Sequence, residues 1–352
     1  MLVLGLETSC DETAAAVVED GLTVRSSVVA SQDDLHAEYG GVVPEIASRA
    51  HVERLTPILE ASLAEAGLSI DAIDAVAVGH RPGLIGSLLT GVAAAKGLAW
   101  SLGRPVVGVD HVHAHLWAAL LGMPRDEIDA LFPALGLVVS GGHTSIYRME
   151  SPATLARLGA TIDDALGEAY DKAATMLGLP YPGGPALDRL AQEPDADERA
   201  VDLPVSSLGR DSLDFSFSGL KTALLYQIRG VPRPAREGGG FPRTLDELDE
   251  NRRRDLAASF QRAAVRAVRK KLERALERDR YAALIAGGGV TANSALRREL
   301  AEITTARGIT LRLPELRFCV DNAAMIAGLG HERLAAGESD DLTLTPVPTT
   351  AC

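Results

Sequence analysis

Three histidines, His111, His113 and His115, lie within five residues of a chain that contains eight histidines in all. The apolar stretch that begins at His115 favours a helix, which places His111 and His115 one turn apart on one face and His113 on the opposite side. A strand would instead put all three on one side. Because two imidazoles one helical turn apart can bind a single metal ion, this spacing predicts a metal site.

The residue that follows His111 argues against a peptidase. In the helical zinc motif of peptidases a glutamate directly follows the first histidine and acts as general base. Val112 occupies that position here. We therefore expect the ion to hold a substrate rather than to activate water for peptide hydrolysis.

Two imidazoles need at least one further ligand, and the best carboxylate candidate is Asp321 in the segment FCVDNAAMIA. This aspartate stands where an apolar helix pattern begins, so the alternative is that it serves only as a helix N-cap. A His/His/Asp set with open coordination positions is compatible with Fe²⁺, Zn²⁺ or Mn²⁺.

Two further segments have the composition of a nucleotide site. The segment IAGGGVTANSAL places glycines between a predicted strand and a predicted helix, where the backbone can lie against a nucleobase or ribose and Asn293 can add polar contacts. Asp171 and Asp188 flank a pair of glycines that includes Gly184, and a carboxylate there can accept ribose hydroxyls or be an ordinary surface acid. No GxxxxGK[ST] and no GxGxxG after the first strand is present, which disfavours a P-loop or Rossmann cofactor site.

The elements that position these residues form two similar halves. Residues 2–18 predict a strand, a polar tip and a second strand, and residues 134–147 repeat that order with the tip SGGHT. Such tips offer backbone N–H groups and hydroxyls to phosphate oxygens, or are merely tight turns. Strand, helix and strand patterns over residues 70–110 predict parallel pairing, and the segment from residue 163 onward predicts a helix that ends at Gly178.

Composition agrees with two α/β lobes. The chain has 352 residues, 46% hydrophobic and only 4% aromatic, which favours sheets and helices packed through aliphatic side chains. Three scattered cysteines, the absence of a basic leader and the lack of an unbroken apolar run of about 18 residues predict a cytoplasmic protein.

The net charge of −13 disfavours indiscriminate binding to nucleic acid, so any contact with a polyanion has to be local. Residues 252–280 contain eleven lysines and arginines against four acids, with apolar residues at helical spacing. This predicts a long helix with a basic face, which is either a solvated surface or a nucleic-acid contact. The segment LDFSFSGLKT adds polar side chains beside two phenylalanines and fits a substrate contact or a packing element equally well.

Taken in order, several of these segments resemble the tRNA N6-adenosine threonylcarbamoyltransferase family, and the match runs from about residue 1 to residue 335. The segments are GLETSCDET, HAEYGGVVPEIASRAH, HVHAH, VVSGGHT, GEAYDKAATMLGLPYPGGP, DFSFSGLKT, AGGGVTANSALR and FCVDNAAMIA. The resemblance implies the two-lobed actin/Hsp70/sugar-kinase fold. Residues 1–109 plus about 323–337 would form the first lobe, residues 110–322 the second with the nucleotide and metal site at the cleft, and residues 338–352 a tail.

The resemblance also implies a reaction and its residues. A threonylcarbamoyl group is transferred from threonylcarbamoyl-adenylate to N6 of adenosine 37 in tRNAs that read codons beginning with A. The implied metal ligands are His111, His115 and Asp321, with Fe²⁺ favoured, and the implied catalytic acids are Asp11 and Glu12. The implied contacts to threonylcarbamoyl-AMP or ATP are Val138, Val139, Ser140, Gly141, Gly142, Asp171, Gly184, Asp188 and Asn293.

The chain departs from the family pattern at two places. Arg81 stands where most relatives have the first glycine of Gly-Pro-Gly-Leu, and His113 stands where many relatives have a residue that binds no metal. The implied partners are the tRNA anticodon loop, a catalytically inert paralogue and a small P-loop ATPase, without a membrane. The rival interpretations are an ATPase or carbamoyltransferase of the same fold that acts on a small molecule, and, less favoured, a metallopeptidase.

Overall fold

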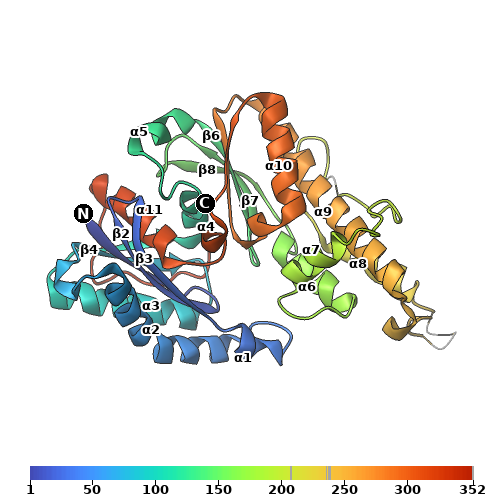
Figure 1. Ribbon diagram of the computed structural model, residues 1–352, viewed down its shortest axis with the longest axis horizontal. Helices are drawn as coiled ribbons and strands as arrows, with labels where there is room; N and C mark the ends of the chain where they lie inside the picture. Colours follow the sequence, from blue (N-terminus) through green and yellow to red (C-terminus); the bar gives the residue numbers. More distant parts are fainter. Residues whose placement is uncertain (207, 235, 237–238, 351–352) are drawn as a thin grey trace.

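Two five-stranded mixed sheets form the framework of the protein, shown as a computed structural model in Figure 1. The structure describes residues 1–206, 208–234, 236 and 239–350. In the first sheet the order is β3-β2-β1-β4-β5, with β1 antiparallel to β2, β2 antiparallel to β3, and β1, β4 and β5 parallel. Its strands are β1 Leu2–Glu7, β2 Glu12–Glu19, β3 Thr23–Ser31, β4 Ala75–Arg81 and β5 Val106–Asp110.

The second sheet repeats this arrangement. Its order is β8-β7-β6-β9-β10, with an antiparallel β6–β7 hairpin and parallel pairing of β6 with β9 and of β9 with β10. Its strands are β6 Ala134–Val139, β7 Thr144–Met149, β8 Leu155–Ala160, β9 Ala283–Gly287 and β10 Thr310–Arg312. The duplication predicted from the two hairpins and the parallel pairing of β4 with β5 are therefore confirmed.

Alternate residues of the central strands enter different cores, which explains why these strands read as continuous apolar runs. Along β1, Val3 packs in the core between the two sheets, whereas Leu4 and Leu6 pack in the core on the outer face. Along β6, Val138 faces the central core and Val139 faces the core beneath the second sheet. The central core is thus shared by both lobes.

Two helices fill the space between the sheets. The helix α11, Ala323–Ala335, packs against β1, β2, β4 and β5, and α4, His111–Ala118, packs against α11 on one side and β6 and β9 on the other. Both begin at the edge where strands of the first sheet end, as Figure 1 shows for α4 near the centre of the molecule. The predicted histidine segment therefore lies at the boundary of the lobes.

Helices cover the outer faces of both sheets. On the first sheet these are α2 Pro44–Ala66 and α3 Ile85–Leu102, while the short α1 Asp33–Ala37 lies at the rim. The second lobe contains α5 Arg125–Ile128, α6 Leu166–Met176, α7 Gly183–Ala191, α8 Ser218–Arg229, α9 Glu250–Arg278 and α10 Ser294–Arg307. As predicted, α6 ends just before Gly178, whose φ of 71° is left-handed.

The basic helix α9 uses many of its cations inside the protein. Arg269 pairs with Glu273 at 2.8 Å and also contacts Glu299 of α10. Lys271 is buried and donates to the carbonyl of Ser212 at 2.8 Å. The basic residues of α9 therefore do not form a freely solvated face, which was one of the two predicted alternatives.

Residues 338–350 lie on the first lobe rather than extending from it as a tail. Asp340 forms an antiparallel bridge with Val106 of β5, and Leu344 is buried in the outer core. The sequence pattern shows no such element because these contacts are made by single residues of an irregular segment. Residues 351–352 are outside the described part of the chain.

Among the described residues, α3 is long and apolar enough to cross a membrane by length and composition alone. The sequence shows no unbroken apolar run there because polar residues such as Thr90 and Lys96 interrupt it. The helix packs against α2, β4 and β5, which is the position of an outer helix in a layered α/β lobe.

Candidate metal and nucleotide site

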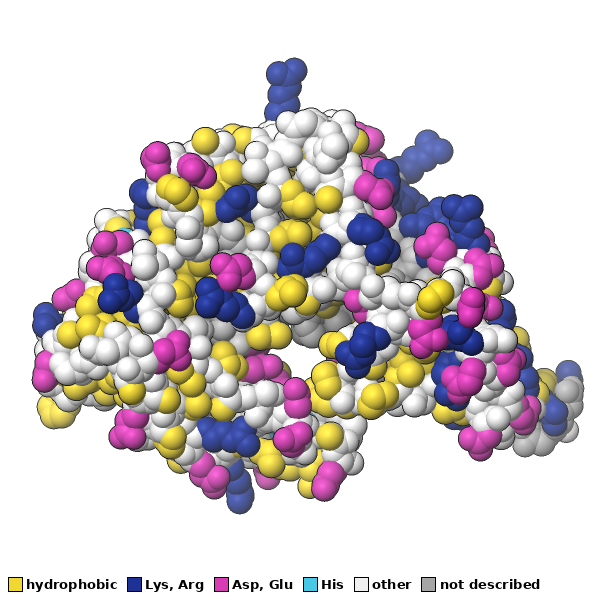
Figure 2. All heavy atoms as spheres, viewed as in Figure 1, with side chains coloured by type: hydrophobic (Ala, Val, Ile, Leu, Met, Phe, Trp, Pro, Cys, Tyr) yellow, Lys and Arg dark blue, Asp and Glu magenta, His cyan; other side chains and the backbone are white. Residues whose placement is uncertain are grey.

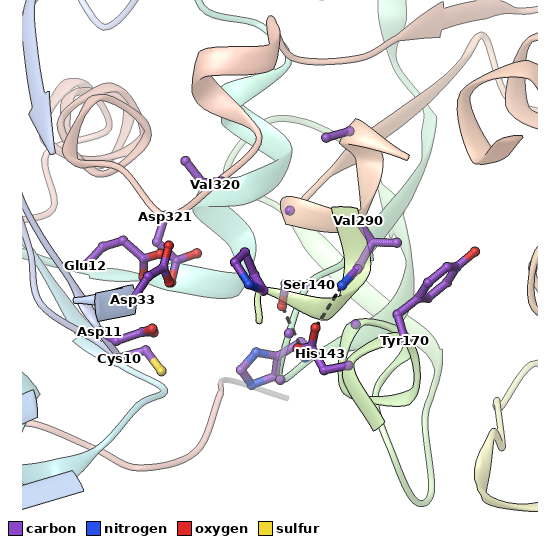
Figure 3. Close-up of a pocket in the computed structure, with 18 of the residues that line it drawn as sticks. Cys10, Asp11, Glu12, Asp33, Ser140, His143, Tyr170, Val290, Val320 and Asp321 are labelled. Carbon is purple, nitrogen blue, oxygen red and sulfur yellow. Dashed lines mark hydrogen bonds between the residues drawn. The ribbon is translucent and has the colours of Figure 1, made fainter. Parts of the chain in front are cut away.

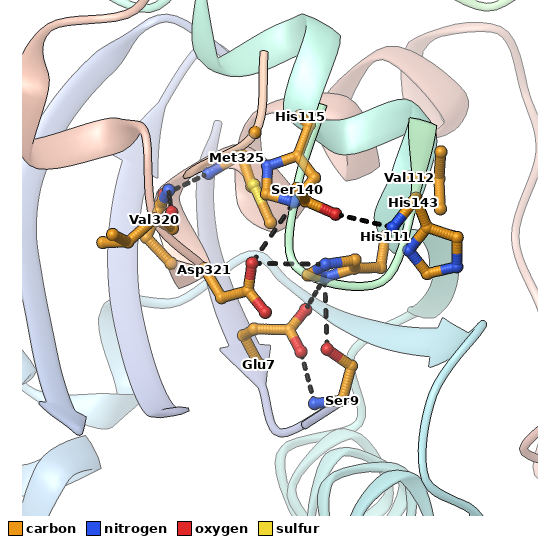
Figure 4. Close-up of polar contacts among 12 residues, drawn as sticks. Glu7, Ser9, His111, Val112, His115, Ser140, His143, Val320, Asp321 and Met325 are labelled. Atoms are coloured by element: carbon orange, nitrogen blue, oxygen red, sulfur yellow. Dashed lines mark hydrogen bonds and ion pairs between the residues drawn. The ribbon is translucent and has the colours of Figure 1, made fainter. Parts of the chain in front are cut away.

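The predicted metal ligands come together where α4 and α11 begin (Figure 4). His111 Nε2 lies 3.4 Å and His115 Nε2 lies 3.2 Å from Asp321 Oδ1. One ligand atom from each of the three residues lies within 4.8 Å of the others. Asp321 is not the cap of α11, because Asn322 caps that helix by accepting from the Met325 N–H at 3.0 Å. The N-cap interpretation of Asp321 is therefore wrong.

The three side chains fit a divalent cation. His115 is completely buried: its Nε2 faces the Asp321 carboxylate at 3.2 Å, and its Nδ1 has no hydrogen-bond partner among the described residues. Nε2 of both rings converges on one oxygen of Asp321, so a bound cation could accept a lone pair from each of the three atoms. Two imidazole nitrogens and one carboxylate oxygen, with further positions open toward the cleft, form a donor set suited to Fe²⁺, Zn²⁺ or Mn²⁺.

Glu7, at the end of β1, binds the ring nitrogen of His111 that faces away from Asp321. His111 Nδ1 donates to Glu7 Oε2 at 3.0 Å, which leaves Nε2 directed toward Asp321. The other oxygen of Glu7 accepts from the Ser9 N–H at 2.5 Å, and the side chain is completely buried. A carboxylate behind a ligating histidine fixes its tautomer and ring orientation. Glu7 could not be recognised in the sequence because it lies 104 residues from His111 along the chain.

Protonation of the metal-free site follows from the same contacts. Burial lowers the pKa of His111, but the carboxylates of Asp321 and Glu7 more than offset this, so the pKa is raised well above its usual value. Burial likewise opposes ionisation of Asp321, yet the two histidines hold its pKa well below the usual range. The metal-free site therefore carries a proton on His111 that a divalent cation has to displace.

His113 points away from the metal ligands, as the helical spacing predicts. Its ring packs edge-on against Tyr147 with 5.3 Å between the ring centroids. Burial lowers the pKa of His113, so the ring is neutral at physiological pH. The residue packs in the interface between α4 and the second sheet and does not belong to the metal site.

A cleft of about 610 Å³ opens from the metal ligands toward the second lobe. Figure 3 shows Asp11, Glu12 and Asp33 on one wall, opposite Ser140 and His143 on the other. Figure 2 shows the surface hollowed between the lobe of α1 to α3 and the lobe of α6 to α8. A volume in this range accommodates a nucleotide-sized ligand.

The first hairpin tip contributes two acids with altered proton affinity. Burial raises the pKa of Asp11, and the Asp321 carboxylate adds to this effect. Burial, followed by the charges of Asp321 and Asp11, raises the pKa of Glu12 well above its usual value. Carboxylates with raised pKa values are suited to accept and release protons near neutral pH.

Most of the predicted nucleotide residues line the cleft. Those that do are Ser140, Gly141, Gly142, Asp171, Gly184, Asp188 and Asn293. Val138 and Val139 do not line it, because both side chains are buried within β6 in the two cores described above. Their inclusion in the predicted contact set is therefore not supported by their placement.

The polar side chains of this set also form hydrogen bonds within the protein. Asp171 Oδ1 accepts from the Gly184 N–H at 3.0 Å, and Asp188 accepts from the N–H and hydroxyl of Ser294 at 3.1 and 2.9 Å. Asn293 caps α10 by accepting from the Leu296 N–H at 2.9 Å. These bonds hold α6, α7 and α10 in position around the cleft.

The glycines of the AGGGV segment have three different roles. A Cβ on Gly287 would lie 1.9 Å from the carbonyl oxygen of His115, so this glycine permits close approach of α4 to β9. Gly288 has a φ of 98°, which side-chain-bearing residues rarely adopt. Gly289 has open space around it and lines the cleft. Only this third glycine matches the predicted contact with a nucleobase or ribose.

Asp33, His143 and Tyr181 are among the residues that line the cleft but were not predicted as site residues from the sequence. Burial lowers the pKa of His143 to about 4, so it faces the cleft as a neutral ring. The SGGHT motif contains His143, but the sequence suggested a function only for the backbone N–H groups and hydroxyls of this tip. Tyr181 lies in the segment GEAYDKAATMLGLPYPGGP, in which other residues drew attention, and Asp33 follows no recognisable pattern.

The LDFSFSGLKT segment is a packing element in the structure. Ser216 and Ser218 donate their hydroxyls to Asp163 at 2.6 and 2.7 Å. Lys221 pairs with Asp164 at 2.6 Å. These contacts join α8 to the loop before α6, and none of the three side chains lines the cleft.

Sequence comparison finds close relatives over the whole chain. The family model described as tRNA N6-adenosine threonylcarbamoyltransferase matches residues 23–328. A protein of that name from Sorangium cellulosum (strain So ce56) is 49% identical over 358 residues, covering 100% of this chain and 97% of the relative. Another from Geobacter sp. (strain M21) is 48% identical over 348 residues, covering 99% and 96%.

Comparison with solved structures agrees on the architecture. HypF of T. kodakarensis superposes with a TM-score of 0.59 at 16% identity, covering 95% of this chain and 48% of that one. Component A of the Acidaminococcus fermentans (R)-2-hydroxyglutaryl-CoA dehydratase has a TM-score of 0.52 at 12% identity, covering 95% and 99%. At such identities the likeness concerns the fold alone, and it confirms the two-lobed actin/Hsp70/sugar-kinase fold.

Proposed function

The chain belongs to the tRNA N6-adenosine threonylcarbamoyltransferase family, and we propose that its cleft transfers the threonylcarbamoyl group from threonylcarbamoyl-adenylate to N6 of the tRNA adenosine that follows the anticodon. The observation that carries this assignment is a His/His/Asp group at one end of a nucleotide-sized cleft, in a chain that matches the family over its full length. The anticodon loop is single-stranded, so its bases can be splayed out into such a cleft.

In the proposed reaction the N6 amine attacks the carbonyl carbon of the threonylcarbamoyl group. A C–N bond forms, the C–O bond to the phosphate of AMP breaks, and AMP leaves with the electron pair. The proton of the amine passes to a base on the protein. The residues of the cleft therefore have to hold the adenylate, place the carbonyl and accept one proton.

The metal end of the cleft places the reacting group. His111, His115 and Asp321 would hold the ion, and Glu7 orients the ring of His111. When bound, a divalent cation supplies Lewis-acid stabilisation of negative charge on the phosphate or carboxylate of the adenylate. Fe²⁺, Zn²⁺ and Mn²⁺ all suit the donor set, and Fe²⁺ is our first choice.

The first hairpin tip supplies the candidate base. Asp11 and Glu12 line the cleft beside Asp321, and burial raises the pKa of both. We assign the proton transfer to Glu12, which lines the cleft together with Asp321 and whose burial makes the ionised carboxylate a stronger base by raising its pKa.

The other end of the cleft would hold the adenosine of the adenylate. The glycine-rich tip at 140–142 offers backbone N–H groups for phosphate oxygens, and Asp171 and Asp188 stand where ribose hydroxyls can be bound. Gly289 allows the nucleobase to approach the backbone.

An exposed apolar patch on the first lobe is the proposed docking surface for the inert paralogue. Val52, Ile85 and Leu89 are 67%, 54% and 56% exposed. They lie within about one turn of the crossing of α2 and α3, where Gly86 meets Ser48. A contiguous exposed apolar patch commonly marks a protein interface. The P-loop ATPase and a cytoplasmic location are further parts of this proposal that come from the family resemblance.

The test is reconstitution with defined components. Purified protein, threonylcarbamoyl-adenylate, a divalent metal, the partner subunits and an unmodified tRNA are combined, and the nucleosides are analysed by mass spectrometry. We expect threonylcarbamoyladenosine in a tRNA that reads a codon beginning with A, and none in a tRNA whose corresponding position is not adenosine. Unmodified tRNA together with carbamoylation of a small molecule would instead support the rival activity.

A further inference from the structure

Residues 340–350, here called the strap, run from the edge of the first sheet to the cleft. Asp340 N–H donates to the Val106 carbonyl at 2.9 Å, and the carboxylate of Asp340 accepts from the Gly108 N–H at 2.8 Å. Leu344 is buried, and its carbonyl accepts from Lys96 Nζ at 3.1 Å. The first half of the strap is therefore fixed to β5 and α3.

The second half of the strap is held by His80, whose ring is in turn contacted by Arg81. Val347 N–H donates to the His80 carbonyl at 2.9 Å, and His80 Nδ1 lies 3.2 Å from the Thr345 carbonyl. Because a carbonyl only accepts, Nδ1 carries the proton, so Nε2 is free to accept from Arg81 Nε at 3.1 Å. Arg81 is the residue that departs from the glycine of the family pattern, and here it selects the tautomer of His80 that binds the strap.

The strap then reaches the helix of the metal ligands. Thr350 Oγ1 donates to Asp110 Oδ2 at 2.8 Å. Asp110 Oδ1 caps α4 by accepting from the N–H groups of Val112 and His113 at 3.0 and 3.3 Å. The same carboxylate therefore joins the strap to the first turn of α4, in which His111 is the first residue. Pro348 lines the cleft together with His111 and Pro82.

We propose that the strap is a functional part of the site: Thr350 is a positioning residue that holds the cap of α4 and with it His111, and Pro348 forms a wall at the metal end of the cleft. Since a cap that is itself held by a hydrogen bond samples fewer orientations, the strap preorganises the first turn of α4. That the ligand in contact with Pro348 is threonylcarbamoyl-adenylate rests on the proposed function. The positioning of His111 by Thr350 does not depend on it.

The first test compares Thr350→Val with Thr349→Val. The first variant removes the hydroxyl bonded to Asp110 at nearly constant volume, and the second makes the same change at the exposed neighbouring residue. With Zn²⁺ as the probe, we expect the dissociation constant to rise about tenfold for Thr350→Val and to stay unchanged for Thr349→Val. Equal zinc affinity of the two variants would overturn the positioning role.

The second test loosens the strap without changing a residue of the metal helix. Arg81→Gly removes the bond to His80 and places at this position the residue that is typical of the family. We expect amide hydrogen exchange over residues 344–350 to become about tenfold faster, and the KM for threonylcarbamoyl-adenylate to rise more than kcat changes. Unchanged protection of these residues would contradict the role of Arg81 in holding the strap.

These readouts separate the strap from the function of the cleft. Weaker zinc binding by Thr350→Val would support the role of the strap even if the wild-type protein failed to modify tRNA. That failure of the wild-type protein would contradict only the proposed function. Normal tRNA modification together with equal zinc binding by both threonine variants would support the proposed function and contradict the strap. Circular dichroism of each variant before metal addition verifies that the fold is intact.

Discussion

At the level of single residues, the proposed metal site includes a supporting carboxylate, Glu7, that no metal-binding motif contains. Glu7 and His111 are 104 residues apart in the sequence, yet their side chains meet at 3.0 Å in a dry interior. The three ligands were predictable because the spacing of His111 and His115 and the acid before the last helix follow known patterns. Glu7 was not predictable, because only the pairing of β1 with β4 and of β4 with β5 brings it to the end of β5.

Glu7→Gln is expected to weaken zinc binding by about tenfold or more, because an amide orients the ring of His111 less strongly than a carboxylate does. The measurement is competition for Zn²⁺ with a chromophoric chelator. Glu19→Gln, at the far end of the same hairpin, changes the net charge equally and serves as the control. Identical zinc affinities of these two variants would show that Glu7 has no orienting role.

Metal binding is expected to release about one proton near pH 7, because the raised pKa of His111 keeps its ring protonated in the metal-free protein. Affinity should therefore fall as the pH falls, since protons and metal compete for the same nitrogen. Calorimetry of Zn²⁺ binding in buffers of different ionisation enthalpy counts the protons. A heat that does not depend on the buffer would contradict the protonation state assigned to His111.

Glu12→Gln is expected to lower the turnover of tRNA modification by about 10² to 10⁴, because the amide cannot accept the amine proton. The KM for the adenylate should change little. Asp11→Asn at the same tip distinguishes the two acids, since only the base is needed for proton transfer. If Asp11→Asn lost turnover and Glu12→Gln did not, the two assignments would be exchanged.

At the level of helices and strands, α4 reaches its position because β9 ends in a glycine. Gly287 meets the carbonyl of His115, and no larger residue fits between β9 and α4 without displacing the metal helix. The sequence predicted the elements well, because strand runs, helix patterns and glycine stops are local signals. It assigned the wrong role to the first two glycines of the triplet, because a glycine that admits a neighbouring helix looks the same in sequence as one that admits a ligand.

Gly287→Ala is expected to lower the free energy of unfolding by about 1 to 3 kcal/mol and to weaken zinc binding, because the added methyl forces α4 away from β9. Gly289→Ala, two residues later with open space around it, should change stability by less than about 1 kcal/mol. Chemical denaturation and zinc titration of both variants make the comparison. Two equally stable variants would mean that the contact between Gly287 and His115 is not tight.

At the level of the whole molecule, two duplicated sheets enclose a shared layer of α4 and α11, and the candidate site residues lie where that layer meets the cleft. The order β3-β2-β1-β4-β5 and its repeat were visible in sequence only as two hairpins, because parallel partners are distant along the chain. The position of residues 338–350 could not be predicted for a similar reason. Their contacts are isolated bonds to several different elements and leave no periodic pattern.

The acidic chain has to bind tRNA through a limited set of cations, and α9 is the candidate segment. Lys270→Glu should weaken tRNA binding and reduce the slope of log K against log salt by about 1, as expected for a phosphate contact. Arg269→Glu should mainly lower thermal stability, because Arg269 pairs with Glu273 and Glu299. Unchanged tRNA affinity and salt dependence in both variants would exclude α9 as a tRNA contact.

The proposed chemistry requires that His111, His115 and Asp321 bind the ion on which transfer depends. The decisive experiment follows metal content and threonylcarbamoyladenosine formation together in the wild-type protein and in His111→Ala, with Zn²⁺, Fe²⁺ or Mn²⁺ added stepwise to metal-free samples. We expect product formation by the wild-type protein to rise in proportion to bound metal and His111→Ala to lack both. Full turnover by the metal-free variant would show that transfer does not depend on this ion.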